Sequence, residues 1–448
     1  MSQIYDVIGI GLGPFNLSLA ALSEPQEDIS TLFLERRTSF DWHPGMMLDD
    51  VTLQTPFMSD LVTMADPTSP YSFLNYAKQK GKLYSFYIRE SFFLLRKEYN
   101  QYCQWVSQSL ASVRFNHNVT SVTYDEQHDY YVVKADNEDV STSGHVHSKR
   151  QTFYTRHLVL GTGPIPYMPE CARGKSANII HSGDYLRHKA KLESASSVAV
   201  IGGGQSAAEI YHDLLQGQQS DSPYLYWLTG SDRYFPLEYT KLTLEMTSPE
   251  YVDYFYQLPA SKRDSLNHHQ KNLYKGINGD LINQIFDLLY QKNLDGPVRT
   301  TLKTHSRLTD VQRNQNALAL TFRHWQLEQD FKINADYVVL ATGFAHSTPG
   351  FLQPLKAHLN YDAKQRFAVS RDYAIDRAQC RVFVQNAEAH THGFVTPDLG
   401  MACYRNSVIL NKITGREVYP VEQQIAFQTF GLDDVEVVGH RQRDEDAA

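Results

Sequence analysis

Two glycine-rich turns, each directly after an apolar run, constrain this chain more than any other feature. The first apolar run, Val7–Ile10, leads into the turn Gly11–Asn16. A short apolar run of this kind is typical of a buried parallel strand, and the turn predicts a helix that begins near Phe15. Gly11 permits a tight bend, Gly13 lets the backbone approach a pyrophosphate, and the helix N-terminus attracts the phosphate charge. The turn therefore predicts a dinucleotide site.

The first turn departs from the usual fingerprint at one position. Asn16 stands where the third small residue, Gly or Ala, is expected, and Pro14 follows Gly13. Glu35 strengthens the prediction, because it ends the next apolar run, Thr31–Leu34, at the separation where an acid holds a ribose hydroxyl. The alternative interpretation is a strand-to-helix turn without chemical meaning.

The second turn fits the fingerprint better. Gly202, Gly204 and Ala207 follow the apolar run Ser197–Ile201 and open a helix. Two such turns are far more specific than one, and they predict two bound dinucleotides. Arg233, after the next strand, suits the 2′-phosphate of NADP, although the neighbouring Asp232 and a plain surface role leave NAD open.

Two apolar strands that end in Thr-Gly close the two nucleotide domains. The first is Leu158–Gly163, and the second, Asp336–Gly343, carries Thr342 and Gly343. The expected fold is α/β, with two nested Rossmann-like domains, FAD on the first turn and a nicotinamide on the second. We expect three parts: an FAD domain (1–165 and 336–448), an NADPH domain (166–234 and 292–335) and a helical substrate-binding insert (235–291).

Composition excludes several other classes of protein. The net charge of −8 argues against nucleic acid as a partner. The four cysteines show no C-x-x-C spacing, which disfavours a disulfide reductase and indicates reduced thiols in a cytoplasmic protein. No apolar run approaches the roughly 18 residues of a membrane span, and no His cluster has the spacing of a metal site.

We also expect a solvated loop over Ser141–Arg150 and a frayed tail after Leu432.

Several segments together resemble the microbial N-hydroxylating flavin monooxygenases of siderophore synthesis, which include lysine, ornithine and diamine N-hydroxylases. The similarity runs from residue 9 to about residue 411, and Phe344 stands where the family commonly has Tyr or His. The segments that carry it are Gly11–Ser18, Trp42–Met46, Leu53–Gln54, Pro70–Tyr76, Gly202–Ser206, Asp336–Pro349 and Thr391–Gly393.

The resemblance implies both cofactors and their contacts. NADPH would reduce FAD, oxygen would add to the flavin as a C4a-hydroperoxide, and a neutral primary amine would take the distal oxygen, with no side chain acting as nucleophile. The FAD contacts implied are Gly11, Gly13, Glu35, Trp42, His43 and the flavin-adjacent Gln54, and those to NADPH are Gly202, Gly204, Gln205, Ser206 and Arg233. Pro14, Asn16, Thr342 and Gly343 complete the expected cofactor residues.

Three departures from the amino-acid hydroxylases bear on the substrate. Ser59 stands where those enzymes carry a Lys that holds the substrate carboxylate, and Leu244 and Leu273 align with or near their Asn residues. A buried carboxylate without its cation costs several kcal/mol. The resemblance therefore implies a decarboxylated amine, putrescine first and cadaverine second, with histamine, lysine and ornithine as alternatives.

Asp398 is our candidate for holding the distal ammonium of such an amine. Glu238 and Glu245 are rivals, and each of these acids could instead be an ordinary surface carboxylate. The alternative functions are a class B flavin monooxygenase acting on sulfur or carbon and a non-catalytic nucleotide-binding protein. Relatives of this kind imply a homo-oligomer, with a tetramer among the possibilities.

Overall fold

The strand before the first glycine turn lies inside a mixed sheet. The computed structural model describes residues 3–140, 146–219, 222–314, 317–432 and 434–437. In it, β1 (Ile4–Ile10) pairs in parallel with β2 (Thr31–Leu34) and β8 (Val146–Leu160). The strand order is β5-β2-β1-β8-β7-β6, and β19 also pairs with β8. The remaining bounds are Val113–Arg114 (β5), His117–Asp125 (β6), Tyr130–Val140 (β7) and Val382–Val384 (β19).

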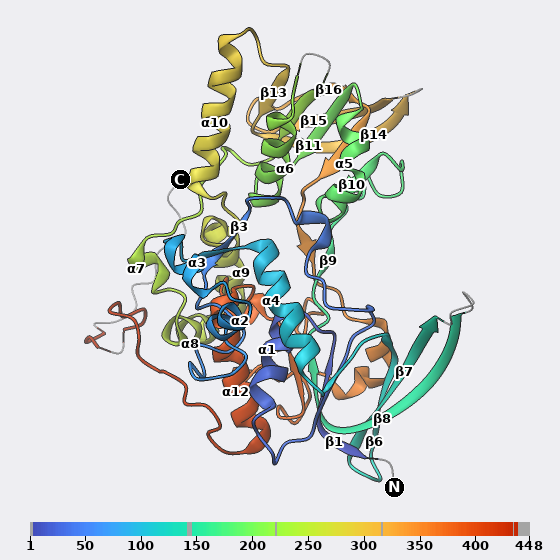
Figure 1. Ribbon diagram of the computed structural model, residues 1–448, viewed down its shortest axis with the longest axis vertical. Helices are drawn as coiled ribbons and strands as arrows, with labels where there is room; N and C mark the ends of the chain where they lie inside the picture. The colour runs from blue at the N-terminus through green and yellow to red at the C-terminus, as the bar shows by residue number, and fades with distance from the viewer. Residues whose placement is uncertain (1–2, 141–145, 220–221, 315–316, 433, 438–448) are drawn as a thin grey trace.

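The chain forms two lobes, and the sheet around β1 lies in the lower one in Figure 1, here called the first lobe. The upper lobe, called the second lobe, holds a second sheet. This sheet is parallel throughout and has the order β10-β17-β11-β12-β13. Its strands are Ile179–His181 (β10), Tyr337–Leu340 (β17), Ser197–Ile201 (β11), Tyr224–Leu228 (β12) and Thr300–Lys303 (β13). We expected the NADPH domain to end at residue 335 and the FAD domain to resume at residue 336, but the pairing of β17 does not agree with this boundary. Because β17 is buried between β10 and β11, it belongs to the second lobe, and the chain leaves that lobe only after Gly343.

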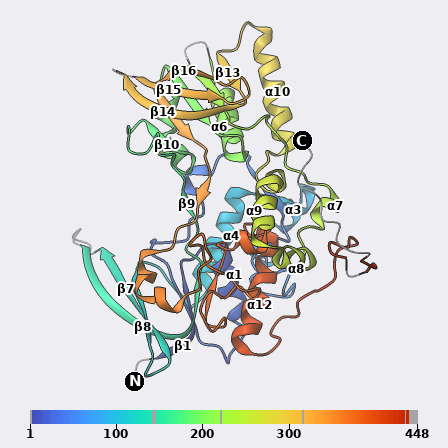
Figure 2. The ribbon, with the colours of Figure 1, turned by 180° about the vertical axis from the view of Figure 1, so that it is seen from behind.

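Smaller strands complete the two lobes. An antiparallel sheet of β14 (Ser306–Asn314), β15 (Ala317–His324) and β16 (Gln329–Ala335) packs on the second parallel sheet. A short ribbon of β9 (Ile165–Pro166) and β18 (Phe344–Ala345) forms where the chain passes between the lobes (Figure 2). β3 (Thr52–Pro56) and β4 (Phe93–Leu95) pair beside the cavity described below.

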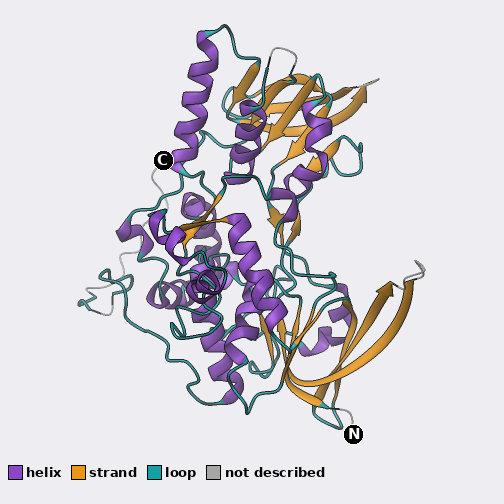
Figure 3. Cartoon of the chain, in the orientation of Figure 1, coloured by secondary structure: helices purple, strands orange, loops and turns teal. Residues whose placement is uncertain are grey.

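Helices cover the sheets in both lobes, as Figure 3 shows. Every residue of α1 (Pro14–Ser23) is buried, because α1 lies against the first sheet and contacts α4 (Arg96–Ser109) and α12 (Ala402–Thr414). The other helices of the first lobe are α2 (Phe73–Gln79), α3 (Leu83–Ile88) and α11 (Ala389–His392), and those of the second are α5 (Tyr185–Glu193) and α6 (Gln205–Gln216). Single-turn or 3₁₀ segments are η1 (Pro44–Met46), η2 (Ser182–Asp184), η4 (Gly350–His358) and η5 (Leu399–Met401).

The expected helical insert divides between the two lobes. Tyr251, Val252 and Phe255 of α8 pack with Phe394 and Met401 of the first lobe. The final helix packs instead on α6 of the second lobe through an apolar stripe that includes Leu281 and Ile285. The insert helices are α7 (Lys241–Leu244), α8 (Pro249–Gln257), α9 (Ala260–His269), η3 (Gln270–Leu273) and α10 (Gly279–Leu294).

Two further expectations concern segments that are only partly described. Residues 146–150 of the expected loop are not a loop but part of β8, paired with β7, while 141–145 lie outside the described residues. In the expected tail, residues 433 and 438–448 also lie outside them. Within the described ranges, no helix has both the length and the apolar character needed to cross a membrane.

Gly45 provides a test of how closely the two lobes approach. A Cβ atom on Gly45 would lie 2.0 Å from the carbonyl oxygen of Gly183, which is backbone and cannot rotate away. We expect Gly45→Ala to lower the free energy of unfolding by about 1–3 kcal/mol through overpacking. Gly279→Ala is the matched control, because a Cβ there meets no atom within 4 Å. Thermal denaturation compares the two variants, and equal unfolding temperatures would contradict the close approach.

Candidate active site

The first glycine turn forms an open cradle at the N-terminus of α1. Gly11 has φ +84°, and a Cβ there would lie 2.6 Å from the carbonyl oxygen of Gly161, so only glycine fits. Gly13 precedes Pro14 as the N-cap residue, without a side-chain cap, and a Cβ on it would meet no protein atom within 4 Å. The helix N-terminus thus has no side-chain cap, and there is free space beside Gly13, which fits the phosphates of FAD.

Asn16 explains why the first fingerprint departs from the usual pattern. Its side chain is fully buried, donates to the carbonyl oxygens of Gly11 (2.7 Å) and Val159 (3.3 Å), and accepts from Gln385 (2.7 Å). Opposite it, a Cβ on Gly161 would lie 2.5 Å from the Asn16 amide carbon. The Asn16 side chain therefore bonds the protein itself, locking the turn to β8 and to the segment after β19.

Glu35 lies beside the same turn. Its carboxylate accepts hydrogen bonds from the backbone N–H of Leu12 (2.7 Å) and of Arg37 (2.9 Å). The end of β2 thus holds an acid against the glycine turn, where it could receive the ribose hydroxyls of a dinucleotide.

The second turn is built in the same way. A Cβ on Gly202 would lie 2.3 Å from the carbonyl oxygen of Ala341, and Gly204 is the N-cap residue of α6, which begins with Gln205 and Ser206. Arg233 is exposed and pairs with Asp232 (2.8 Å), so its charge faces solvent rather than the protein core. Thr229 and Ser231 of the same segment lie beside the turn, since a Cβ on Gly203 would be 2.4 Å from the Thr229 hydroxyl and 3.0 Å from the Ser231 hydroxyl. This arrangement fits the phosphates of NADPH.

Thr342 and Gly343 have structural partners at the end of β17. The Thr342 hydroxyl donates to the carbonyl oxygen of Tyr167 (2.6 Å), and the Gly343 carbonyl lies 2.9 Å from Nε2 of His181. These contacts fix the crossing between the lobes.

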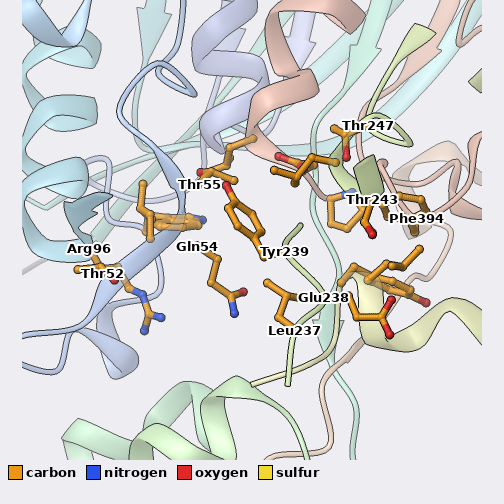
Figure 4. Close-up of a pocket in the computed structure, with 18 residues that line it drawn as sticks. Thr52, Gln54, Thr55, Arg96, Leu237, Glu238, Tyr239, Thr243, Thr247 and Phe394 are labelled. Carbon is orange, nitrogen blue, oxygen red and sulfur yellow. The ribbon is translucent and has the colours of Figure 1, made fainter. Parts of the chain in front are cut away.

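A cavity of about 290 Å³ lies between β3, the insert and the segment 394–399. It brings together Trp42, Gln54, Glu238, Leu244, Leu273 and Asp398, which are far apart in the sequence. Figure 4 shows Thr52, Gln54 and Arg96 on one side and Glu238, Thr243 and Phe394 on the other. Arg96, Tyr239 and Thr243 are lining residues that sequence reasoning missed, although Tyr239 and Thr243 lie between two residues that it identified.

Asp398 is fixed in the turn that precedes α12. Its Oδ1 accepts from the backbone N–H of Gly400 (2.8 Å), which caps η5. Burial raises the pKa of Asp398 above its ordinary value, while the charge of Arg405 opposes the shift. Ser59 lies beside it, since a Cβ on Gly400 would be 3.2 Å from both Ser59 Oγ and Asp398 Oδ1. Ser59 itself is buried and is not among the residues that line the cavity.

The two rival acids are placed differently. Glu238 lines the cavity but is exposed, and it accepts a hydrogen bond from Asn272. Glu245 is not a lining residue, and its carboxylate accepts from the backbone (3.0 Å) and side chain (2.9 Å) of Gln428. Asp398 is thus the acid that combines a place in the cavity wall with restricted access to water.

An aromatic row leads from the cavity wall toward the second lobe. The ring of His43 lies 4.9 Å from that of Trp42 and 5.7 Å from that of Phe344, which lies 5.0 Å from His181. Burial, assisted by the charges of Arg96 and Arg37, lowers the pKa of His43 to about 4. His43 is therefore neutral at physiological pH, and its ring packs between those of Trp42 and Phe344.

Comparisons with known proteins agree with this geometry. A putrescine N-hydroxylase of Shewanella oneidensis is 52% identical over 429 residues, covering 95% of this chain and 84% of that protein. The FAD-bound cadaverine monooxygenase of desferrioxamine biosynthesis from Erwinia amylovora is 55% identical, with TM-score 0.93 over 96% of this chain and 99% of that chain. An ornithine N-hydroxylase of Kutzneria sp. 744, solved with reduced FAD, NADP⁺ and L-ornithine, is 28% identical, with TM-score 0.83 over 92% and 99% of the two chains.

These similarities confirm the predicted fold and agree with the two predicted cofactors, FAD and NADPH. The sequence model of the L-lysine 6-monooxygenase/L-ornithine 5-monooxygenase family matches residues 3–346, which is more than half of the chain. The chain therefore belongs to the L-lysine 6-monooxygenase/L-ornithine 5-monooxygenase family and is a flavin-dependent N-monooxygenase.

Proposed function

We propose that this enzyme N-hydroxylates a primary aliphatic diamine, putrescine first and cadaverine second, as an early step of siderophore synthesis. The observation that carries the proposal is the cavity itself, whose wall combines Asp398 with Leu244 and Leu273. Ser59, the residue that stands where the amino-acid hydroxylases carry a Lys, lies behind the wall beside Asp398. Relatives named as a putrescine N-hydroxylase and a cadaverine monooxygenase support the same substrate class.

The charges around the cavity favour a substrate with two amines. Arg96 is a cation of its wall, but its guanidinium is already paired with the Glu209 carboxylate (2.8 Å) and bonded to the Met46 carbonyl (2.8 Å). It is therefore poorly placed to receive a substrate carboxylate. Asp398 and Glu238 leave two acidic groups in the wall, and an ammonium bound there is favoured over an α-carboxylate.

The same walls prepare the reacting amine. When bound, reduced FAD supplies activated oxygen to the nitrogen, and the amine must be neutral to attack it. An ordinary ammonium has a pKa near 10.4, so deprotonation at pH 7 costs roughly 4.6 kcal/mol. Leu237, Leu244, Leu273 and Phe394 are apolar members of the cavity wall. Contact with apolar groups desolvates an amine, and desolvation lowers the pKa of the amine. Asp398 would hold the distal ammonium and so orient the chain of the substrate.

Measuring the hydroxylamine product tests the substrate class directly. Putrescine, cadaverine, histamine, lysine and ornithine are compared under saturating FAD and NADPH, because NADPH oxidation alone also includes uncoupled oxygen reduction. We expect product from the two diamines and little from lysine or ornithine. Product chiefly from an amino acid would contradict the proposal, and product from histamine alone would replace the aliphatic diamine by an alkylamine that carries an imidazole ring. No hydroxylamine from any amine would favour a substrate oxidised at sulfur or carbon.

Replacing Asp398 tests its role at the distal ammonium. Asp398→Asn keeps an oxygen that can accept from Gly400 but removes the charge, and we expect kcat/KM for putrescine to fall roughly 30-fold or more, about 2 kcal/mol or more. Glu238→Gln is the matched control on the exposed side of the cavity and should change kcat/KM less than about threefold. A larger loss in Glu238→Gln than in Asp398→Asn would assign the ammonium to Glu238.

The pH dependence follows from the raised pKa of Asp398. On acidification this carboxylate takes up a proton at a higher pH than an exposed aspartate does, and its attraction for the ammonium is then lost. We expect the KM for putrescine to rise as the pH falls, and kcat to rise toward pH 8 or above as more amine becomes neutral. In Asp398→Asn the acid-side rise in KM should be absent. A KM that varies equally with pH in both enzymes would contradict this role for Asp398.

We also propose that the enzyme is a cytoplasmic homo-oligomer, with a tetramer among the possible forms. Light scattering on the FAD-loaded protein measures its mass in solution, and a monomer at all concentrations would contradict the oligomer.

A further inference from the structure

A buried ion pair joins the two lobes beside the cavity. Arg96 is the first residue of α4 in the first lobe, and Glu209 lies on α6 of the second. Their contact is bidentate, with Nη2 to Oε1 at 2.8 Å and Nη1 to Oε2 at 3.0 Å. The side chains are only 14% and 1% exposed, respectively. Two charges so far from water remain stable only while their geometry is maintained, so the pair favours one arrangement of the lobes.

The pair belongs to a wider hydrogen-bonded chain. Gln205, directly after the second glycine turn, donates to Glu209 Oε1 (2.9 Å). The side-chain oxygen of Gln205 accepts from the backbone N–H of Asn278 (2.8 Å) and from Gln54 (3.3 Å). Gln54 and Arg96 both line the cavity. The chain of contacts therefore runs from the cavity wall to the N-terminus of the helix that fits NADPH.

Two other contacts between the lobes differ in kind from the ion pair. The β9–β18 ribbon tethers the lobes through their two linkers, and Gly45 meets Gly183 by close backbone packing. Neither contact carries charge or reaches the cavity. Glu209 does not line the cavity, and its two oxygens are occupied by Arg96 and Gln205, so it is not a substrate ligand.

We propose that Glu209 is a positioning residue, which through Arg96 and Gln205 holds the second lobe at the angle that brings NADPH to FAD. The inference rests on the cofactor assignment and not on which amine is oxidised. Small errors in the placement of two reacting groups reduce rates strongly, so loss of this ion pair should slow flavin reduction even when NADPH is bound.

The first experiment measures flavin reduction by NADPH in FAD-loaded enzyme without oxygen or amine. We expect Glu209→Gln to lower the limiting rate at saturating NADPH about tenfold or more, with the Kd for NADPH changed less than about threefold. Asp213→Asn is the matched control, because Asp213 lies on the same helix but pairs with Lys189 of its own lobe (2.7 Å). It should stay within about twofold of the parent rate. Because no amine is present, failure of the diamine proposal does not affect this result.

A double-mutant cycle separates the ion pair from independent effects. Arg96→Gln removes the partner, and the double variant should be no slower than Glu209→Gln alone if the two side chains act as a unit. Rates that fall multiplicatively would overturn the proposal, as would a Glu209→Gln rate within twofold of the parent. If Glu209→Gln fails to retain FAD, Arg96→Lys carries the same test, since it keeps the charge but loses the bidentate geometry.

Hydrogen exchange provides a readout that does not depend on turnover. In the FAD-loaded enzyme without NADPH, Glu209→Gln should increase amide exchange at residues 44–48 and 205–209, where the lobes meet, and Asp213→Asn should not. Slow flavin reduction with unchanged exchange in these segments would contradict a positioning role.

Discussion

The close packing of each glycine turn against the end of a neighbouring strand is the constraint on which the rest of the structure depends. Gly11 approaches the backbone of Gly161, and Gly202 approaches that of Ala341, at distances that exclude any side chain. In both lobes this contact sets the N-terminus of a helix at the carboxyl end of a parallel sheet, where open α/β sheets bind ligands. Asn16 reinforces the first turn by bonding Gly11 within the turn and Val159 of β8.

A second buried ion pair connects the first turn to the cavity that carries Asp398. Arg405 of α12 lies 3.0 Å from Glu388 and donates to the carbonyl oxygen of Thr396 (2.7 Å), two residues before Asp398. Its guanidinium also lies 4.7 Å from the ring centre of Phe15 in α1. Arg405 thus ties the turn that carries Asp398 to the helix beneath the FAD cradle. The acid expected to hold the substrate and the turn expected to hold the flavin therefore share one rigid support.

Local sequence patterns predicted much of this architecture, but they could not predict contacts between residues that are far apart in the sequence. The apolar run Thr31–Leu34 is β2 to the residue, and both glycine turns begin helices as expected. The boundary at residue 336 differed because the pairing of β17 depends on β10 and β11, not on its own sequence. Likewise, we expected most of α10 in the insert because its sequence continues the helical pattern of that segment. Its apolar stripe packs instead on α6 of the second lobe.

Local patterns located only part of the candidate site. Gln54, Glu238, Leu244, Leu273 and Asp398 line one cavity, whereas Ser59 is buried outside its lining. Arg96 and Glu209 gave no local signal, because an ion pair between two helices in different lobes has no sequence spacing to recognise. The fingerprint also could not show that Asn16 bonds the protein, since its partners Val159 and Gln385 lie far along the chain.

A crystal structure of the enzyme with FAD, NADP⁺ and putrescine would show directly which acid holds the substrate. We predict one ammonium of putrescine within roughly 3.2 Å of the Asp398 carboxylate and the other amine facing the flavin. An ammonium bound at Glu238, or putrescine bound outside this cavity, would contradict the central claim that Asp398 selects a diamine.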